Sequence, residues 1–174
     1  MTELHLAKLL TPGRIALHTA PPGRVEAIDA LIALHASSGV LSDPARYRAD
    51  VLLREEEGST ALGRNLAIPH AKSAGVLRPA LAAMTVREGV DWEAPDQGPA
   101  RLLFMIAAPL EGGDLHLQIL ARLMKTLVHG NLPQRLITAA APAAFLAALV
   151  AEEGMAFPQK EHNGGTPWSK NYLL

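Results

Sequence analysis

Apolar side chains recur at helical spacing in two segments of the N-terminal half of the chain. Residues 25–38 place theirs on one face of a helix, and Gly39 is a natural stop for that helix. The segment from Pro44 to Gly58 predicts a second helix, because Asp43 can cap its N-terminus and proline is favoured in a first turn. The pattern therefore predicts two successive helices in this half of the chain.

Two apolar runs in the second half of the chain have the length of strands. They span residues 80–86 and 101–107, and glycine, proline and aspartate bracket them. A long helix follows, which Asp114 can cap and which ends at Gly130. The apolar positions expected on its inner face are Leu117, Leu120, Ala121, Met124, Leu127 and Val128.

The order of the elements indicates the fold class and the extent of the domain. Two shorter helices, over about residues 133–139 and 142–151, complete the set. Strands that alternate with helices are typical of an α/β layered fold. A chain of 174 residues has the size of one domain, to which we assign residues 1–153. Glycine, proline and asparagine interrupt any periodicity in residues 154–174, which we interpret as a flexible tail, a linker or a cloning remnant.

Composition limits both the core and the partners of this chain. Hydrophobic residues make up 49% of it and aromatic residues only 4%, so alanine, leucine, valine and isoleucine must build the core. A formal net charge of −1 gives no electrostatic basis for binding nucleic acid. The sequence contains no cysteine and no apolar run with the length of a membrane span. We therefore expect a cytoplasmic protein without membrane insertion, whose partners are proteins or small molecules.

His70 is the first candidate for chemistry. It follows the apolar run that ends at Ile68 and Pro69. Proline fixes its own φ and biases the preceding residue towards extended geometry, so a strand is expected to stop there and His70 to open a turn. A neutral imidazole keeps one ring nitrogen free, which suits phosphate acceptance, acid–base work or metal binding. From the residues alone, an ordinary surface histidine beside a turn is also compatible with this pattern.

Several separated blocks of the sequence, taken in order, resemble a known family. The blocks are Leu41-Ser42-Asp43, Val51-Leu52-Leu53-Arg54-Glu55, Gly58-Ser59-Thr60, Ala67-Ile68-Pro69-His70, Gly89-Val90-Asp91-Trp92, Leu103 to Pro109 and Asp114 to Ala121. They resemble the fructose/mannitol-type (type 2) enzyme IIA domains of the bacterial phosphoenolpyruvate-dependent sugar phosphotransferase system, and the fructose branch most. The resemblance covers about residues 4–150, and it implies a mixed sheet of about five strands flanked by helices.

The resemblance also implies roles for three residues. His70 matches the histidine that accepts and donates the phosphoryl group, and His116 matches the neighbouring histidine that assists it. Arg54 matches an arginine that stabilises the phosphoryl group. A guanidinium stays charged and can bind two phosphate oxygens at once, which suits that role. From the residues alone, a histidine near a helix N-terminus and a cation at a helix C-terminus are also ordinary local features.

Further residues are expected around these three. Ser59 and Thr60 are placed behind them, where they can orient the helix end or contact phosphate oxygens. Glu55 is placed there as well, and the sequence leaves open whether it orients Arg54, orients His116 or does neither. Trp92 is interpreted as a packing residue. A relay protein also needs an exposed apolar rim on which its partners dock, and the residues expected in that rim are Leu66, Ile68, Leu110 and Leu115.

The function implied by the resemblance is a phosphoryl relay in sugar uptake. A histidine phosphocarrier protein is the expected donor, and the cysteine of an enzyme IIB domain, which serves the membrane subunit IIC, is the expected acceptor. No cofactor or metal is implied. A regulatory, nitrogen-related enzyme IIA that uses the same histidine is the alternative. A second alternative is a metal-dependent hydrolase that uses His70 and His116. The sequence does not support it, because neither histidine belongs to a His-Glu-x-x-His or His-x-His motif.

Overall fold

A mixed β-sheet with helices on both faces forms the framework of the protein, in agreement with the predicted α/β class. The computed structural model describes residues 3–159. The strands are β1 (Ile15–Thr19), β2 (Ala61–Gly63), β3 (Leu66–Ala67), β4 (His70–Ser73), β5 (Ala80–Val90) and β6 (Ala100–Pro109). The helices are α1 (Arg24–Ser37), α2 (Pro44–Glu57), α3 (Leu115–Leu127), α4 (Leu132–Ile137) and α5 (Pro142–Ala156), and the 3-10 turns η1 (Leu6–Lys8) and η2 (Pro12–Arg14) precede β1.

The two longest strands, β5 and β6, form the centre of the sheet. They pair antiparallel, β1 lies parallel to β5 on the other side, and β3 and β4 both lie parallel to β6. β2 pairs with β3 at the far edge. Ile68 and Pro69 separate β3 from β4, so these two short strands share one position beside β6. The sheet thus has five positions, which confirms the architecture implied by the family resemblance.

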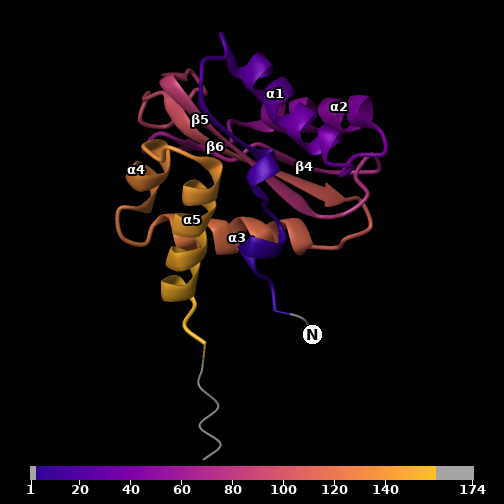
Figure 1. Cartoon of the computed structure of the whole chain (residues 1–174). Helices are drawn as coiled ribbons and strands as arrows, with labels where there is room; N and C mark the ends of the chain where they lie inside the picture. The colour runs from indigo at the N-terminus through magenta and orange to yellow at the C-terminus, as the bar shows by residue number, and fades with distance from the viewer. Residues whose placement is uncertain (1–2, 160–174) are drawn as a thin grey trace, which may run out of the picture.

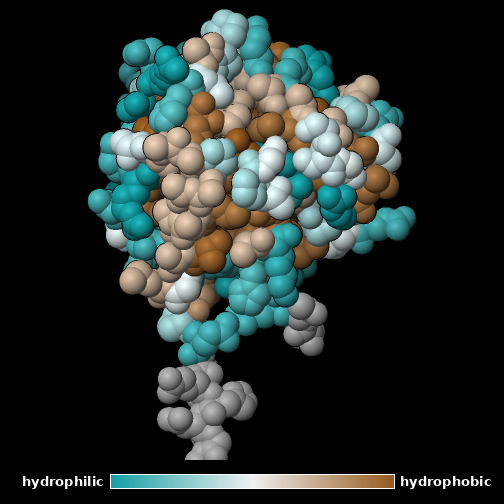
Figure 2. Space-filling view, in the orientation of Figure 1, coloured by the Kyte–Doolittle hydropathy of each residue, from teal (hydrophilic) through white to brown (hydrophobic). Residues whose placement is uncertain are grey.

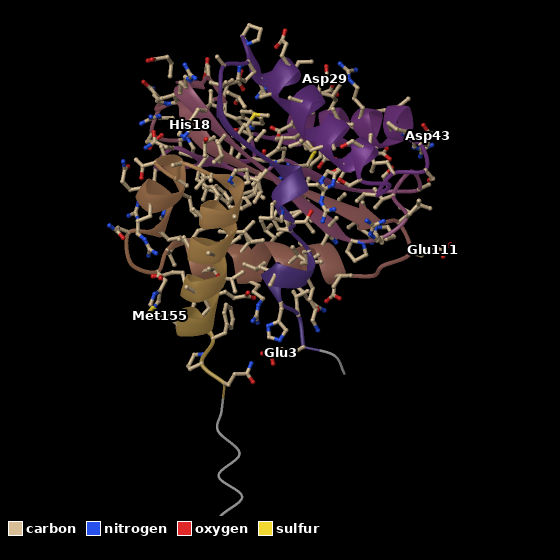
Figure 3. All side chains as sticks on the ribbon, viewed as in Figure 1. Glu3, His18, Asp29, Asp43, Glu111 and Met155 are labelled. Atoms are coloured by element: carbon tan, nitrogen blue, oxygen red, sulfur yellow. The ribbon has the colours of Figure 1, made fainter. Side chains whose placement is uncertain are left out.

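The start of α2 illustrates how a local signal sets an element boundary. The Asp43 carboxylate accepts a hydrogen bond from the Arg46 N–H at 3.0 Å, and Pro44 occupies the first turn. Figure 3 shows Asp43 at this end of the helix. The cap satisfies one of the free N–H groups that every helix N-terminus leaves. The predicted beginning of the second helix is therefore confirmed.

β5 is longer than the strand predicted over residues 80–86. It continues to Val90, through residues expected in a loop. The pairing with β6 shifts register between Thr85 and Val90, and Val90 then lies opposite Ala100. The local sequence favours a loop here, but this second stretch of pairing with β6 extends the strand.

Two apolar clusters, one on each face of the sheet, make up the core. α1 and α2 cover the first cluster, which includes the fully buried Tyr47, and α3, α4 and α5 cover the second, which includes Phe145 (Figure 1). Successive side chains of a strand point to opposite faces. Met105 of β6 accordingly belongs to the first cluster and Ile106 to the second. This alternation tells on which face of the sheet each side chain near the site lies.

The face that α3 buries agrees only in part with the one predicted, because Leu127 is the one buried residue among the six expected inside. Its buried side chains are Ile119, Leu123, Thr126 and Leu127. Three residues expected inside are exposed by 53%, 36% and 72%, and these are Leu117, Met124 and Val128. Ala121 is exposed as well, and Leu120 is half-buried. The segment carries apolar residues on two faces, and helical spacing alone does not tell which of them the sheet covers.

α5 extends past the predicted domain boundary at residue 153. The helix continues to Ala156, and the ring centre of Phe157 lies 4.0 Å from the guanidinium carbon of Arg122 in α3. Figure 2 shows apolar residues along the outer side of α5, with hydrophilic side chains to the left of them. The first residues assigned to the tail therefore belong to the folded domain, because α5 packs on α3. Residues 160–174, the rest of the expected tail, lie outside the described residues.

His35 of α1 is a fully buried histidine. Its Nε2 lies 3.3 Å from the Met105 carbonyl oxygen, and its ring meets the ring of Tyr47 edge-on. Within residues 3–159, its Nδ1 has no hydrogen-bond partner. Burial removes water from the charged ring and lowers the pKa of His35 to about 4. The folded protein therefore holds this imidazole in its neutral form at neutral pH.

We expect His35 to make the fold less stable in acid. The unfolded chain takes up this proton near pH 6.5, as is usual for histidine, whereas the folded chain does so only near pH 4. The free energy of unfolding therefore falls as the pH drops through this window, by about 3 kcal/mol for a shift of this size. Urea unfolding at several pH values measures the loss. The free energy of unfolding of His35→Leu should fall less steeply with pH than that of the wild type, and equal slopes for the two proteins would contradict the assignment.

Candidate active site

His70 is the first residue of β4 and does not open the turn that the preceding proline predicts. The Pro69 carbonyl accepts a hydrogen bond from the Ile106 N–H of β6 at 3.1 Å. The backbone of His70 then lies opposite Ile106 in the parallel pairing of β4 with β6. Pairing with β6 thus carries the extended conformation on beyond the proline, and the half-buried imidazole projects from a strand.

The backbone selects the tautomer of His70. Its Nδ1 lies 2.7 Å from the carbonyl oxygen of Ile68. A carbonyl oxygen can only accept a hydrogen bond, so Nδ1 carries the proton and Nε2 of the neutral ring keeps its lone pair. Ile68 is held in turn, because its N–H donates to the Thr60 carbonyl at 3.1 Å. Nε2 is therefore the nitrogen of the His70 ring that keeps a free lone pair.

The surroundings of His70 favour its neutral form. Burial lowers the pKa of His70, the hydrogen bond to Ile68 raises it, the charge of Arg54 lowers it and the charge of Glu55 raises it, with a net shift downward. Desolvation penalises the charged imidazolium, which explains the leading contribution. A neutral ring with a free lone pair is the form that can accept a phosphoryl group.

Arg54 lies in the last turn of α2, near enough to His70 for its charge to act on the ring. Its Nη1 donates to the Gly58 carbonyl at 2.9 Å. Among the residues that the structure describes, Arg54 forms no ion pair. A guanidinium has several further N–H donors, which stay available for an anion. The fold thus brings an unneutralised positive charge to the side of His70.

His116 lies in the first turn of α3, close to His70 and Lys72. Burial first, and then the charges of Lys72 and His70, lower the pKa of His116. Its Nδ1 is buried without a hydrogen bond of good geometry to any described residue, although the Gly113 carbonyl is near enough to oppose the shift. The lowered pKa favours the neutral form of the His116 ring beside His70.

The N-terminus of α3 has no side-chain cap. Asp114 occupies the N-cap position, but its Oδ1 accepts a hydrogen bond from the side-chain amide of Gln118 at 3.0 Å, and it caps no backbone N–H. The predicted capping by Asp114 is therefore wrong, because Gln118 takes its carboxylate. The positive end of the helix dipole favours an anion beside His116.

The Glu55 carboxylate is buried in a hydrogen-bonded cluster and does not pair with Arg54. It accepts from the Thr60 hydroxyl, from the Thr60 N–H at 3.3 Å and from Trp92 Nε1 at 3.4 Å. Trp92 is fully buried, as expected of a packing residue, and its Nε1 also donates to Thr60 Oγ1 at 3.2 Å. Glu55 and Trp92 are 37 residues apart in sequence. No local pattern signals this contact, and sequence reasoning missed it.

Ser59 and Thr60 hold the turn that follows Arg54. The Ser59 hydroxyl donates to the Trp92 carbonyl and accepts from the Ala61 N–H at 3.1 Å. The Thr60 carbonyl accepts from the N–H of Ile68, whose own carbonyl holds the His70 ring. A continuous chain of hydrogen bonds therefore runs from Glu55 through Thr60 and Ile68 to His70. A direct contact of Ser59 or Thr60 with phosphate oxygens stays a prediction.

The expected apolar rim is only partly exposed. Leu66 and Ile68 are 8% and 1% exposed, because both pack into the cluster under α3, α4 and α5. Their assignment to an exposed rim is therefore wrong. Leu115 is half-buried against the same cluster, whereas Leu110 is 53% exposed at the end of β6. Leu117 of α3, next to His116, is equally exposed and was not assigned to the rim.

The described residues contain neither a metal-binding cluster nor a membrane-spanning helix. Within residues 3–159, no three histidine, aspartate or glutamate side chains gather closely enough to hold a metal ion. In the same part of the chain, no helix combines the length and the apolarity that crossing a bilayer requires. The histidine pair of the site therefore stands with two cations, Arg54 and Lys72, and without a cluster of acidic ligands.

Comparison with known families identifies the family of the chain. Residues 8–152 match the family described as "Phosphoenolpyruvate-dependent sugar phosphotransferase system, EIIA 2". The chain belongs to this family. Domains of this EIIA family are phosphoryl-relay components of the phosphotransferase system. The resemblance noted in the sequence is thereby confirmed.

Two relatives of known name show how such a domain occurs. The fructose-specific EIIA component of Haloferax volcanii is 38% identical over 125 residues, which are 72% of this chain and 81% of that protein. The fructose-specific EIIABC component of Bacillus subtilis is 36% identical over 136 residues, which are 78% of this chain and 21% of that protein. This chain thus spans most of the first relative and about a fifth of the second.

Solved structures show the same fold. The nitrogen regulatory protein IIA-Ntr of Neisseria meningitidis aligns with a TM-score of 0.75 and 27% identity over 82% of this chain and 97% of that one. The mannitol enzyme IIA of Escherichia coli, in a complex with phosphorylated mannitol enzyme IIB, aligns with a TM-score of 0.72 and 25% identity over 82% of this chain and 97% of that one. EIIA domains with sugar-related and regulatory names therefore share this framework.

Proposed function

We propose that this EIIA domain relays a phosphoryl group through Nε2 of His70 in the uptake of fructose or a related sugar. The donor is a histidine phosphocarrier protein and the acceptor is the cysteine of an enzyme IIB domain. The observation that carries the proposal is the 2.7 Å contact between His70 Nδ1 and the Ile68 carbonyl, which leaves Nε2 as the free nucleophile. Arg54 and His116 flank that atom and supply positive or polar groups for the phosphate oxygens.

The first transfer is a displacement at phosphorus. The lone pair of His70 Nε2 forms the new N–P bond while the N–P bond of the carrier's phosphohistidine breaks, and that electron pair returns to the carrier's ring. The phosphoryl group keeps its three outer oxygens, on which the negative charge is spread. Arg54 can bind two of those oxygens at once, and His116 lies at the uncapped end of α3. Positioning and charge stabilisation by these groups lower the barrier.

The second transfer returns the site to its starting state. A cysteine thiolate of the IIB domain attacks phosphorus, the bond to His70 Nε2 breaks, and Nε2 recovers its lone pair. The related mannitol enzyme IIA, in its complex with phosphorylated enzyme IIB, supports this choice of acceptor. A relay must not hold the phosphoryl group too tightly, because a deep ground state slows the next step. His70 is only half-buried, and few side chains are placed to bind the phosphoryl group, which suits a group that stays on the site briefly.

The sugar and the branch of the family rest on relatives. The fructose-specific EIIA and EIIABC components are 38% and 36% identical to this chain. These identities favour the fructose branch. The alternative is a regulatory domain of the nitrogen-related branch, which the similarity to IIA-Ntr of Neisseria meningitidis supports at 27% identity. Both functions use His70, and they differ in the proteins that deliver or receive the phosphoryl group.

Reconstitution with purified partners tests the proposal. The protein is incubated with phosphoenolpyruvate, enzyme I and a histidine phosphocarrier protein, and then with a fructose-type IIB domain, while intact mass is followed. We expect one phosphoryl adduct that the IIB domain removes within the time of mixing. A second incubation replaces this carrier with the phosphocarrier protein of the nitrogen-related branch. An adduct that forms as fast from the second carrier as from the first, and that the IIB domain does not remove, would favour the regulatory function. A protein that gains no adduct from either carrier would contradict both.

A further inference from the structure

The strand that carries His70 also carries a lysine two residues later. Along β4 the half-buried His70 and Lys72 alternate with the buried Ala71 and Ser73. In an extended strand, side chains two residues apart point to the same face and are separated by about 7 Å. The long lysine side chain can span that distance. Lys72 therefore projects from the same face of β4 as the imidazole of His70.

The register of β4 on β6 decides which face this is. His70 lies opposite Ile106, and Lys72 lies opposite Ala108. Ile106 packs into the cluster under α3, α4 and α5, whereas Ala71 belongs to the cluster under α1 and α2. Aligned residues of paired strands point to the same face. The side chains of His70 and Lys72 thus lie on the face of the sheet that α3 covers, and α3 begins with His116 in its first turn.

Lys72 has no partner that would explain its position. Among residues 3–159 it forms no ion pair. The carboxylate of Asp114, at the N-cap of α3, is engaged with Gln118. The charge of Lys72 acts on His116 and lowers the pKa of that ring, which agrees with a position beside it. The ammonium of Lys72 is therefore available to an anion that arrives at the site.

We propose that Lys72 is a further ligand of the phosphoryl group carried by His70. Lys72 approaches the phosphoryl group from the α3 side of β4, and Arg54 approaches it from α2. The inference rests on the proposed function. The phosphoryl group then lies on the α3 side of β4, with Lys72 and His116 beside it and with Arg54 reaching it from the end of α2. A lysine binds phosphate as a point charge and an arginine as a planar fork, so the two residues contribute differently. Lys72 attracts the incoming dianion, and Arg54 orients it.

The test compares two donors and three variants. Lys72→Gln removes the charge and keeps most of the length, Lys72→Arg keeps the charge, and Lys8→Gln removes a charge from the exposed turn η1 as a matched control. Phosphoramidate, a small molecule that phosphorylates histidine rings, serves as a donor that needs no protein docking, and the phosphorylated histidine carrier serves as the second donor. We expect Lys72→Gln to accept the phosphoryl group about tenfold more slowly from both donors. Lys72→Arg and Lys8→Gln should stay within about twofold of the wild type.

NMR titration supplies a readout that a merely structural role would not move. Removal of the Lys72 charge should raise the pKa of His116 in Lys72→Gln, while Lys8→Gln leaves it unchanged. A Lys72→Gln protein that is slow with the carrier alone assigns Lys72 to docking and overturns the proposal, as does wild-type behaviour with both donors. If neither donor phosphorylates the wild type, the proposed function itself fails. A phosphorylated wild type with an unaffected Lys72→Gln overturns only the inference about Lys72.

Discussion

His70→Ala is expected to accept no phosphoryl group under conditions in which the wild type gains one group per chain. The substitution removes Nε2, the ring nitrogen left free when Nδ1 binds the Ile68 carbonyl. Under the proposal His116 assists His70 and is not a second acceptor, so His70→Ala leaves no acceptor in the site. Intact mass after incubation with phosphoenolpyruvate, enzyme I and the histidine carrier measures the loss.

The matched control for this prediction is His116→Ala. It also removes one imidazole from the site, but it leaves Nε2 of His70 in place, so it should still gain one phosphoryl group at long incubation. Circular dichroism and urea unfolding establish that both variants are folded. A folded His70→Ala protein that gains a full equivalent of phosphate would exclude His70 as the acceptor.

Arg54→Gln is expected to slow both transfers about a hundredfold without changing the final stoichiometry. A charge-assisted, two-pronged contact with phosphate oxygens is worth about 2–3 kcal/mol, and every 1.4 kcal/mol corresponds to about a factor of ten. Within residues 3–159 of the free protein, the side chain of Arg54 makes a single hydrogen bond, to the Gly58 carbonyl. Its loss should therefore leave the fold nearly unchanged. Rapid-quench kinetics of phosphoryl gain and of discharge to IIB measure the two rates.

Arg54→Lys separates charge from geometry in the same experiment. A lysine keeps the positive charge but loses the planar fork, so its rates should lie between those of the wild type and Arg54→Gln. Arg46→Gln, at the exposed N-terminal end of the same helix, is the control for a lost surface charge. Rates of Arg54→Gln equal to those of the wild type would show that Arg54 serves only the helix end.

Elements with a local signal were predictable from the sequence. α2 begins where the Asp43 side chain binds the Arg46 N–H, and this cap can be recognised from Asp followed by Pro. The central strands β5 and β6 appeared as apolar runs, because they are buried on both faces. The short strands β1 and β2 escaped prediction, since they owe their conformation to their neighbours in the sheet.

Burial depends on tertiary packing and was harder to predict. Leu66 and Ile68 follow the pattern of an exposed rim beside His70, yet the pairing of β3 and β4 with β6 directs them into the core. Leu117 and Leu127 both fit a helical stripe of α3, and only contact with the sheet shows that the second is inside and the first outside. A helix with apolar residues on two faces leaves this choice to the rest of the fold.

The candidate site shows the same division. His70, His116 and Arg54 could be named from their spacing through the family resemblance. The cluster of Glu55 with Trp92 joins residues 37 apart, and no local rule points to it. Lys72 could have been found from its place two residues after His70, because the period of a strand is two, but the prediction of a turn at His70 concealed that relation.

The position of the phosphoryl group on the His70 ring tests the central claim most directly. Long-range proton–nitrogen correlation NMR of the phosphorylated, nitrogen-15-labelled protein distinguishes the two ring nitrogens of each histidine. We predict a single phosphohistidine, at His70, with phosphorus on Nε2 and a proton retained on Nδ1, because Nδ1 is held by the Ile68 carbonyl. Phosphorus on Nδ1 of His70, or on any nitrogen of His116, would contradict the account.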